Sequence, residues 1–322
     1  MAYSAEVMRE ARLRLKNQRR ERELLADHQR REAYEARPRL RTLDLQLRTS
    51  VAQVMASAFQ KRENPQQAIE QAKASNLAAQ KERSLLLAEL RMEDYLDTDA
   101  PCPHCGGTGW AGQTLCSCLR TLCREVQMEQ FINLPGENIP GFVSFRTDLY
   151  SSQQDPKYGS SPRKQMTETK GFCEDWVRDF RKGSPSLLLT GGTGLGKTLL
   201  SACIGRSVTM LTEAGVVYTR ATELLRAYEG AQFGNAEHPV KYEEADLLIL
   251  DDLGTEMTTQ FTNATLYNLL DGRLLAGRPT VISTNLPPDV LQQRYPPQLL
   301  SRLLGQYESL IFFGSDLRMY GR

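Results

Sequence analysis

The sequence Ser186-Leu-Leu-Leu-Thr190, followed at once by Gly191-Gly-Thr-Gly-Leu-Gly-Lys-Thr198, decides the fold of this chain. The first part is a short apolar segment typical of a buried strand, and residues 199–208 continue with a helical pattern. Between them lies the phosphate-loop pattern of Gly, four residues, and Gly-Lys-Thr. The glycines let the backbone curl so that successive N–H groups face phosphate oxygens, and the helix N-terminus favours the same negative charge.

We expect every residue of this loop to help bind ATP, namely Gly191, Gly192, Thr193, Gly194, Leu195, Gly196, Lys197 and Thr198. Lys197 would reach the β- and γ-phosphates, and the Thr198 hydroxyl would ligate Mg²⁺. The alternative is a glycine-rich turn that matches by chance. The strand before the loop and the helix after it argue against that alternative, because a phosphate loop requires both.

Residues 245–252 form a second buried strand, which ends in Asp251 and Asp252. The strand ends of such sheets face the ligand crevice. We expect Asp251 to hold Mg²⁺ and Asp252 to orient and polarise the attacking water. An ordinary turn that closes a strand is the alternative, and the preceding phosphate loop argues against it.

A third strand over residues 279–283 ends in Thr284-Asn285. The Asn285 amide could reach the γ-phosphate or the attacking water. It could equally be a turn residue before Pro287-Pro288.

Helix and strand patterns alternate from Arg163 to the end of the chain, which predicts a parallel sheet with helices on both faces, an α/β fold. The predicted strands are Leu187–Thr190, Val216–Thr219, Leu247–Leu250 and Thr280–Thr284. The predicted ATPase domain therefore spans residues 163–322.

A metal site is predicted upstream by four of the seven cysteines. Cys102-Pro-His-Cys105 is followed, after ten residues, by Cys116-Ser-Cys118. Two close pairs of thiols joined by a glycine-rich loop suit tetrahedral zinc, and four protein ligands would make the site structural. His104 or Cys123 could replace one thiol, because Cys-x-Cys is less usual than Cys-x-x-Cys. Free cysteines at chance spacing are the remaining alternative.

The segments around the cysteines complete the organisation. Residues 1–100 read as long helices, with a stripe at Leu40, Leu43 and Leu47 and a break at Asn64-Pro65 that suggests an antiparallel helical hairpin. Residues 101–131 form the predicted zinc module. Turn-forming residues dominate 132–162, which we interpret as a linker that lies over the next domain without packing inside it.

Composition is that of a globular chain of 322 residues, with a net charge of +1 and roughly two domains. The N-terminus lacks the apolar stretch of a secretory signal, and no apolar run could span a bilayer. We expect a cytoplasmic protein with no membrane partner. Residues 1–48 contain 13 Lys and Arg against 8 Asp and Glu, which most often marks a solvated helix face.

The motifs together resemble a known family. LLLTGGTGLGKTLLSACI, LLILDDLGTE, RPTVISTNL and LLSRLLG are similar to the DnaI/DnaC-type helicase-loader ATPases, which belong to the AAA+ class, and to the related IstB-like transposition helpers. CPHCGGTGW and CSCL resemble the loaders specifically, whose zinc domain binds the replicative helicase. The resemblance covers residues 101–322 well and residues 1–100 only in general character.

The resemblance implies an ATP-dependent loader that binds a DnaB-type helicase with residues 1–130 and delivers it to single-stranded DNA. It implies self-association through the AAA+ domain, with Asn285 as the sensor-1 residue. Arg302 would be an arginine finger that reaches a neighbouring subunit's nucleotide, and Arg273 is a weaker candidate for that interface. DNA contacts are implied within residues 220–244, where cations and stacking faces are available on Arg226, Tyr228, Phe233 and Lys241.

Two departures from the family pattern stand out. Asp252 occupies a position where many AAA+ proteins have Glu, and few residues follow Arg302, so the usual helical lid is missing. Arg318 is the only late candidate for a sensor-2 arginine. A transposition helper that acts on double-stranded DNA, and an adaptor that binds ATP without turnover, are the alternative functions.

Overall fold

The computed structural model describes residues 3–59, 65–92, 102–132, 134, 141–234 and 239–319. Asn64 of the predicted helix break and the turn-forming residues 135–140 lie outside these ranges. The chain divides into two compact units, residues 13–118 and residues 1–12 with 119–322. Each unit is described by itself.

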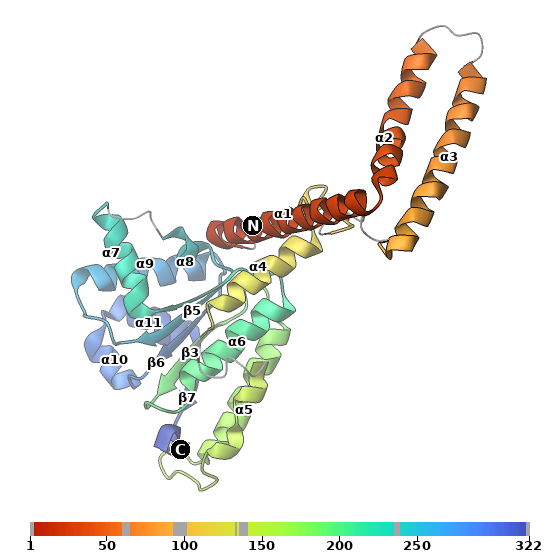
Figure 1. Cartoon of the computed structure of the whole chain (residues 1–322). Helices are drawn as coiled ribbons and strands as arrows, with labels where there is room; N and C mark the ends of the chain where they lie inside the picture. Colours follow the sequence, from red (N-terminus) through yellow and green to blue (C-terminus); the bar gives the residue numbers. More distant parts are fainter. Residues whose placement is uncertain are drawn as a thin grey trace. The chain divides into compact units, whose positions relative to one another are not determined.

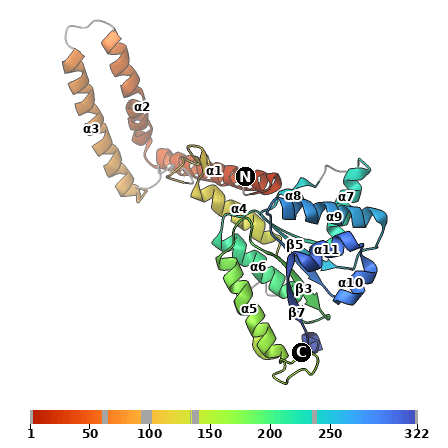
Figure 2. The same cartoon turned by 180° about the vertical axis from the view of Figure 1, so that it is seen from behind.

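Long helices make up most of the first unit. α1 spans Ala5–Ala36, α2 spans Pro38–Phe59 and α3 spans Pro65–Leu90. Pro38 stands at the first position of α2, where a missing N–H costs nothing. α2 and α3 lie side by side along their length (Figure 1 and Figure 2). The predicted helical N-terminal region is confirmed.

A small apolar cluster and one buried carboxylate hold the helices of this unit together. Leu40 and Leu87 are almost completely buried and pack with Ala33 of α1. Asp44 accepts hydrogen bonds from the Tyr34 hydroxyl at 2.7 Å and from Arg83 Nε at 2.7 Å. Because Asp44 is only 7% exposed, loss of either donor would leave a buried charge poorly satisfied.

The cysteine-rich segment folds as a short hairpin followed by a helix. Strand β1, Trp110–Ala111, pairs antiparallel with β2, Thr114–Leu115. Helix α4, Ser117–Glu129, begins directly after Cys116, so that Cys118 lies in its first turn.

A five-stranded parallel sheet in the order β4-β5-β6-β3-β7 forms the centre of the second unit. Its strands are β3 (Ser186–Gly191), β4 (Val216–Arg220), β5 (Leu247–Leu253), β6 (Thr280–Thr284) and β7 (Tyr307–Phe312). The four predicted strands are present, and the predicted α/β class with a parallel sheet is confirmed. β7, which pairs with β3, was not predicted.

Helices cover both faces of this sheet (Figure 1). α5 (Pro162–Arg178) and α6 (Lys197–Leu211) lie on one face, while α7 (Ala221–Gln232), α9 (Gln260–Leu275), α10 (Pro288–Arg294) and α11 (Pro297–Gly305) lie on the other. Alternate strand residues serve the two cores: Ile249 packs toward α6, whereas Leu248 and Leu250 pack toward α9. Full burial of each such side chain contributes about 1.5–3 kcal/mol, which makes these two cores the main stabilising feature of the unit.

Among its described residues, part of the predicted linker packs inside this unit, contrary to the expectation that residues 132–162 lie over the domain. Phe145 and Tyr150 are 1% and 3% exposed and belong to the same core as α5 and α6. Phe145 directly follows the 3₁₀ helix Gly141–Ser144, and Tyr150 directly follows the 3₁₀ helix Thr147–Leu149. The prediction was wrong because it rested on the many turn-forming residues of this segment and gave no weight to the two aromatic side chains. Aromatic side chains bury a large apolar surface when they pack in a core.

The outer edge of β4 is covered by two side chains, which we call the glutamine ladder. Gln127 accepts from the Val216 N–H at 2.7 Å and donates to the Ala214 carbonyl at 3.2 Å. Gln130 accepts from the Tyr218 N–H at 2.8 Å and donates to the Val216 carbonyl at 3.0 Å. The two carboxamides thus take the hydrogen bonds that a neighbouring strand would take.

Candidate nucleotide-binding and metal sites

The phosphate loop joins the end of β3 to the start of α6 and has the backbone of an anion cradle. Gly191, Gly194 and Gly196 have φ angles of 149°, 72° and 84°, values that favour glycine. A Cβ atom at Gly191 would lie 2.0 Å from the Phe312 carbonyl oxygen of β7. The strand that sequence reasoning missed is therefore one reason why the loop must begin with glycine.

Lys197 is buried at the first position of α6. Its ammonium donates to the Gly191 carbonyl at 2.8 Å and to the Gly192 carbonyl at 2.6 Å, so it closes over the loop. Burial, against the attraction of Asp252 and Asp251, lowers the pKa of Lys197 to about 8. A phosphate group would supply the negative charge that this buried cation lacks, so the residues fit a nucleotide.

Asp251 sits at the end of β5, 1% exposed and surrounded by hydroxyl groups. The Thr198 hydroxyl lies 3.3 Å from Asp251 Oδ1, which also accepts from the Ser283 hydroxyl. The Tyr218 hydroxyl donates to Oδ2 at 2.6 Å. Mg²⁺ is bound in proteins through carboxylate and hydroxyl oxygens, so Thr198 and Asp251 fit it as ligands. Sequence reasoning identified these two but missed Ser283 and Tyr218.

Asp252 occupies a bulge of β5, where the pairing with β6 shifts between Leu250 and Leu253. Its φ of 57° is left-handed, an uncommon conformation for a non-glycine residue that turns its side chain away from the regular ladder. Asn285 Nδ2 lies 3.3 Å from Asp252 Oδ1. Burial, reinforced by the charge of Asp251, raises the pKa of Asp252. The structure thus brings together the residues predicted to orient water and to sense the γ-phosphate.

Two further segments lie against the phosphate loop, and neither was predicted there. The Tyr150 hydroxyl donates to the Leu195 carbonyl at 2.8 Å. The Leu317 N–H donates to the Gly194 carbonyl at 3.0 Å, and a Cβ at Gly194 would lie 1.8 Å from Asp316 Oδ1. Arg318 is bound to Asp316 at 3.0 Å, and its charge is one of those that lower the pKa of Lys197. The segment around Leu317 therefore contacts the phosphate loop directly.

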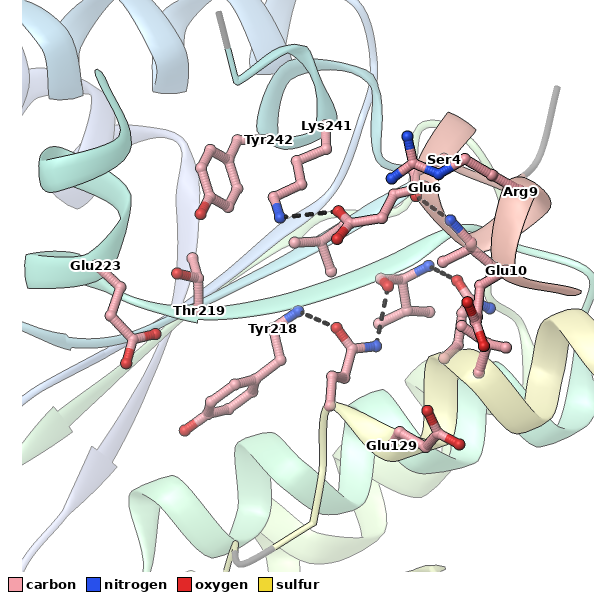
Figure 3. Close-up of a pocket in the computed structure, with 16 residues that line it drawn as sticks. Ser4, Glu6, Arg9, Glu10, Glu129, Tyr218, Thr219, Glu223, Lys241 and Tyr242 are labelled. Carbon is pink, nitrogen blue, oxygen red and sulfur yellow. Dashed lines mark hydrogen bonds and ion pairs between the residues drawn. The ribbon is translucent and has the colours of Figure 1, made fainter. Parts of the chain in front are cut away.

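A cavity of about 470 Å³ opens on another side of the unit, beside the edge of β4 (Figure 3). Lys241 forms an ion pair there with Glu6 at 3.2 Å, and Tyr218 and Tyr242 also line it. A smaller cavity of about 390 Å³ lies next to the phosphate loop, lined by residues 149–153, Pro162, Arg163, Ser315 and Leu317.

The two arginines considered for a subunit interface have different surroundings. Arg302 lies on α11 with its side chain 31% exposed, paired with Asp271 at 2.6 Å. Arg273 is 1% exposed, and its guanidinium donates to main-chain carbonyls that include those of Tyr242 and Pro279. The expectation that Arg273 could serve the interface is wrong, because this side chain is committed to the interior of the unit.

The predicted DNA-contacting residues fall into two groups. Phe233 is 72% exposed and Arg226 is exposed as well. The Tyr228 hydroxyl instead donates to Glu243 at 3.1 Å, and Lys241 is engaged with Glu6 as described above. DNA contact by any of them stays a prediction.

The structure brings the four predicted thiols of the cysteine module together. The sulfur atoms of Cys102, Cys105, Cys116 and Cys118 all lie within 4.8 Å of one another. Two of these distances are 3.6 and 3.5 Å, close to the edge of about 3.8 Å in a tetrahedron with Zn–S bonds of 2.3 Å. The donor set therefore fits zinc.

Local contacts favour a thiolate at one of these positions. Burial opposes ionisation of Cys105, but the Gly109 N–H, the thiols of Cys118 and Cys116 and the Gly107 N–H all hydrogen-bond to its sulfur, outweigh burial and lower its pKa to about 6. His104 is exposed and Cys123 lies in α4 with a pKa raised to about 11 by burial. Among the described residues, the cluster holds the four cysteines and neither proposed substitute.

Comparison with known proteins finds similarity in the second half of the chain. The family profile described as IstB-like ATP binding protein matches residues 161–306. This segment is similar to IstB-like ATP-binding proteins, and its phosphate loop and parallel sheet have the arrangement of a P-loop nucleotide-binding fold.

Individual relatives are distant. The uncharacterized protein YdaV of Escherichia coli K12 is 22% identical over 194 residues, 60% of this chain and 74% of that protein. An ATP-binding protein of insertion sequence IS1162 from Pseudomonas fluorescens is 30% identical over 117 residues, 35% of this chain and 47% of the relative. The crystal structure of the DnaC helicase loader is similar with a TM-score of 0.44 and 17% identity, and the match covers 52% of this chain and 96% of DnaC.

Among the described residues, no helix is both long and apolar enough to cross a membrane.

Proposed function

We propose that this protein hydrolyses ATP and uses the nucleotide to load a DnaB-type replicative helicase onto single-stranded DNA. The observation that carries the proposal is the presence, in one chain, of a segment similar to IstB-like ATP-binding proteins and a separate cluster of four thiols. The first supplies nucleotide chemistry. The second gives a small module a metal-held surface with which to bind a partner.

The carboxylate pair supports hydrolysis rather than binding alone. Thr198 and Asp251 would hold Mg²⁺, which when bound neutralises charge on the β- and γ-phosphates. Asp252 is held apart from Asp251 by the bulge and lies beside Asn285, so it can accept a proton from water while the amide fixes the water's position. When the nucleotide binds, the Lys197 ammonium would exchange its hydrogen bonds to the Gly191 and Gly192 carbonyls for bonds to the phosphates. We place the adenine in the cavity next to the loop, between Tyr150 and Leu317.

Assembly would complete the site. Arg302 is partly exposed and pairs with Asp271 on the surface of α9 and α11, so it is available to an adjacent subunit. An arginine supplied in trans acts on the charge that develops on the γ-phosphate. We therefore propose that turnover requires self-association through the ATPase unit. Single-stranded DNA would contact residues 220–244, with the exposed Arg226 and Phe233 as candidates.

Metal binding would stabilise the surface with which the cysteine module contacts its partner. Four thiolates leave no open coordination position, so the zinc would be structural. The segment around it, residues 102–118, has only a two-residue pair of strands and cannot build a core of its own. The helical hairpin of α2 and α3 adjoins it in sequence and belongs to the same unit. We propose that this unit contacts the helicase.

An IstB-like transposition helper that acts on double-stranded DNA is the second candidate. It is favoured by the profile match over residues 161–306 and by the likeness to the insertion-sequence protein. The cysteine cluster favours the loader, because a transposition helper of this kind typically lacks a zinc module.

Helicase capture separates the two candidates. The full chain is immobilised and exposed to the host's hexameric replicative helicase, and ATP turnover is measured with single- and double-stranded DNA. A loader captures the helicase and is stimulated by single strands, whereas a transposition helper captures none and responds to duplex. Turnover that neither DNA changes, together with no capture, would contradict both. Cys123→Ala, outside the cluster, is the matched control for variants of the four thiols.

A further inference from the structure

Tyr218, on the edge strand β4, makes three separate contacts within the second unit. Its N–H donates to the Gln130 side chain at 2.8 Å (Figure 3). Its ring packs edge-to-face on Phe131, with centroids 5.9 Å apart. Its hydroxyl donates to Asp251 at 2.6 Å. No motif in the sequence singles out this residue.

The Tyr218 hydroxyl contacts the Asp251 carboxylate oxygen that Thr198 and Ser283 do not contact. Thr198 and Ser283 both lie at Oδ1, whereas Tyr218 donates to Oδ2. A phenol is protonated near neutral pH, so the Tyr218 hydroxyl is the donor in this bond and the carboxylate is the acceptor. A donor on each oxygen fixes the plane of the carboxylate, as outer partners do for metal ligands generally.

The position of Tyr218 is in turn set by the end of α4. The Gln130 side chain accepts a hydrogen bond from the Tyr218 N–H and donates one to the Val216 carbonyl. It therefore binds the main chain of β4 on each side of Val217. Phe131 follows in sequence and is 1% exposed. α4 itself starts within the cysteine module, with Cys118 in its first turn. A continuous series of contacts therefore runs from this helix to the magnesium carboxylate.

We infer that Tyr218 is a positioning residue for Asp251 and that Gln130, at the end of α4, sets its position. Magnesium-dependent nucleotide binding would consequently depend on how α4 sits on β4. This rests on the proposed use of Mg²⁺ with ATP, and it adds a route by which the helix that follows the cysteine module acts on the nucleotide site.

Tyr218→Phe tests the hydroxyl while it keeps the ring against Phe131. Binding of a fluorescent ADP analogue to the full chain is titrated with Mg²⁺ and, separately, measured in EDTA. We expect the magnesium concentration at the midpoint to rise about tenfold, as when an outer partner of a metal ligand is lost. Affinity in EDTA should stay within about twofold of wild type, because no phosphate contact changes. Tyr34→Phe is the matched control, since Tyr34 also donates to a buried carboxylate at 2.7 Å.

Gln130→Ala and Gln127→Ala test the link to α4. Each removes one carboxamide of the glutamine ladder, and their melting temperatures should fall by similar amounts. Only Gln130→Ala should raise the magnesium midpoint, because Gln127 does not contact Tyr218.

The outcomes separate this inference from the proposed function. Failure of the wild-type chain to bind nucleotide would overturn the proposed function. Normal magnesium-dependent binding by wild type with an unchanged midpoint in Tyr218→Phe would overturn the inference alone. An equal midpoint shift in both glutamine variants would overturn the role of Gln130.

Discussion

Replacement of Arg273 by alanine should strongly destabilise the second unit, which contains the five-stranded sheet, whereas replacement of an exposed interface arginine would not. The guanidinium is 1% exposed. It donates to the carbonyls of Tyr242, Ala245 and Pro279 at 2.9, 2.9 and 2.7 Å, and to the Thr280 hydroxyl at 2.9 Å. These acceptors belong to the end of α8 (Val240–Glu244), with the residue that follows it, and to the start of β6, so one side chain of α9 joins both segments.

The magnitude follows from what alanine leaves behind. Several buried acceptors lose a charged donor, and the side chain leaves a cavity. Losses of this kind are not additive. We expect the free energy of unfolding to fall by about 3–5 kcal/mol in total. In a unit of this size each kcal/mol lowers the melting temperature by about 2–4 °C, so we expect a fall of about 6–20 °C.

Thermal unfolding of the full chain, followed by circular dichroism, measures the effect. Arg302→Ala is the control, because it breaks one partly exposed ion pair and should cost less than about 1 kcal/mol. The melting temperature of Arg273→Lys should lie between those of Arg273→Ala and Arg302→Ala, since an ammonium has three donors and lacks the planar geometry of a guanidinium. A melting temperature for Arg273→Ala within about 2 °C of wild type would refute the structural role.

Four further outcomes follow from the nucleotide and metal sites. Lys197→Ala should weaken ATP binding at least about tenfold in equilibrium titration, because a charge-assisted phosphate contact is lost; an affinity within threefold of wild type, roughly, would remove the phosphate-loop assignment. Asp252→Asn should keep binding and lose about 10²-fold or more in turnover, and unchanged turnover would place the base elsewhere. Arg302→Ala should lower assembly-dependent hydrolysis by about 10³-fold, and mixing it with Lys197→Ala should restore part of the activity; no recovery with normal assembly argues against a trans role. Replacement of Cys116 and Cys118 by Ser should lose zinc, measured by elemental analysis, and helicase capture together, with ATP binding retained. Full zinc occupancy in that variant would exclude both thiols as ligands.

The phosphate loop was predictable because its chemistry is contiguous. Strand, glycines, lysine and helix follow one another along the chain, so no tertiary information is needed to place Lys197 at a helix N-terminus. The same holds for Asp251 and Asp252, which end a near-continuous apolar run typical of a strand buried on both faces. The cysteine pairs were visible for the same reason, since their spacing alone brings the thiols near one another.

Features that depend on register or on packing were not predictable. Tyr218 and Ser283 reach Asp251 only because β4 and β6 flank β5 in this alignment. β7 was missed because Glu308 and Ser309 interrupt its apolar pattern at the sheet edge, where only part of the strand is buried.

Arg273 illustrates a different limit. Nothing in Asp271-Gly-Arg273 distinguishes an exposed helix arginine from a buried one, because its acceptors come from carbonyls in other segments. The contact of the tail with the loop is equally non-local, since Leu317 and Gly194 are far apart in sequence.

The glutamine ladder also determines where this protein can be cut. A fragment that starts at Arg163 keeps the phosphate loop and every strand of the large sheet, yet it leaves the outer edge of β4 with unpaired main-chain groups. Open edges of this kind recruit strands from other molecules, so such a fragment should aggregate as it is concentrated. A fragment that starts at Leu119 carries its own edge cover in α4. For expression of a soluble fragment that contains the five-stranded sheet, the useful boundary therefore lies before the two glutamines, well ahead of the domain start that the sequence motifs predict.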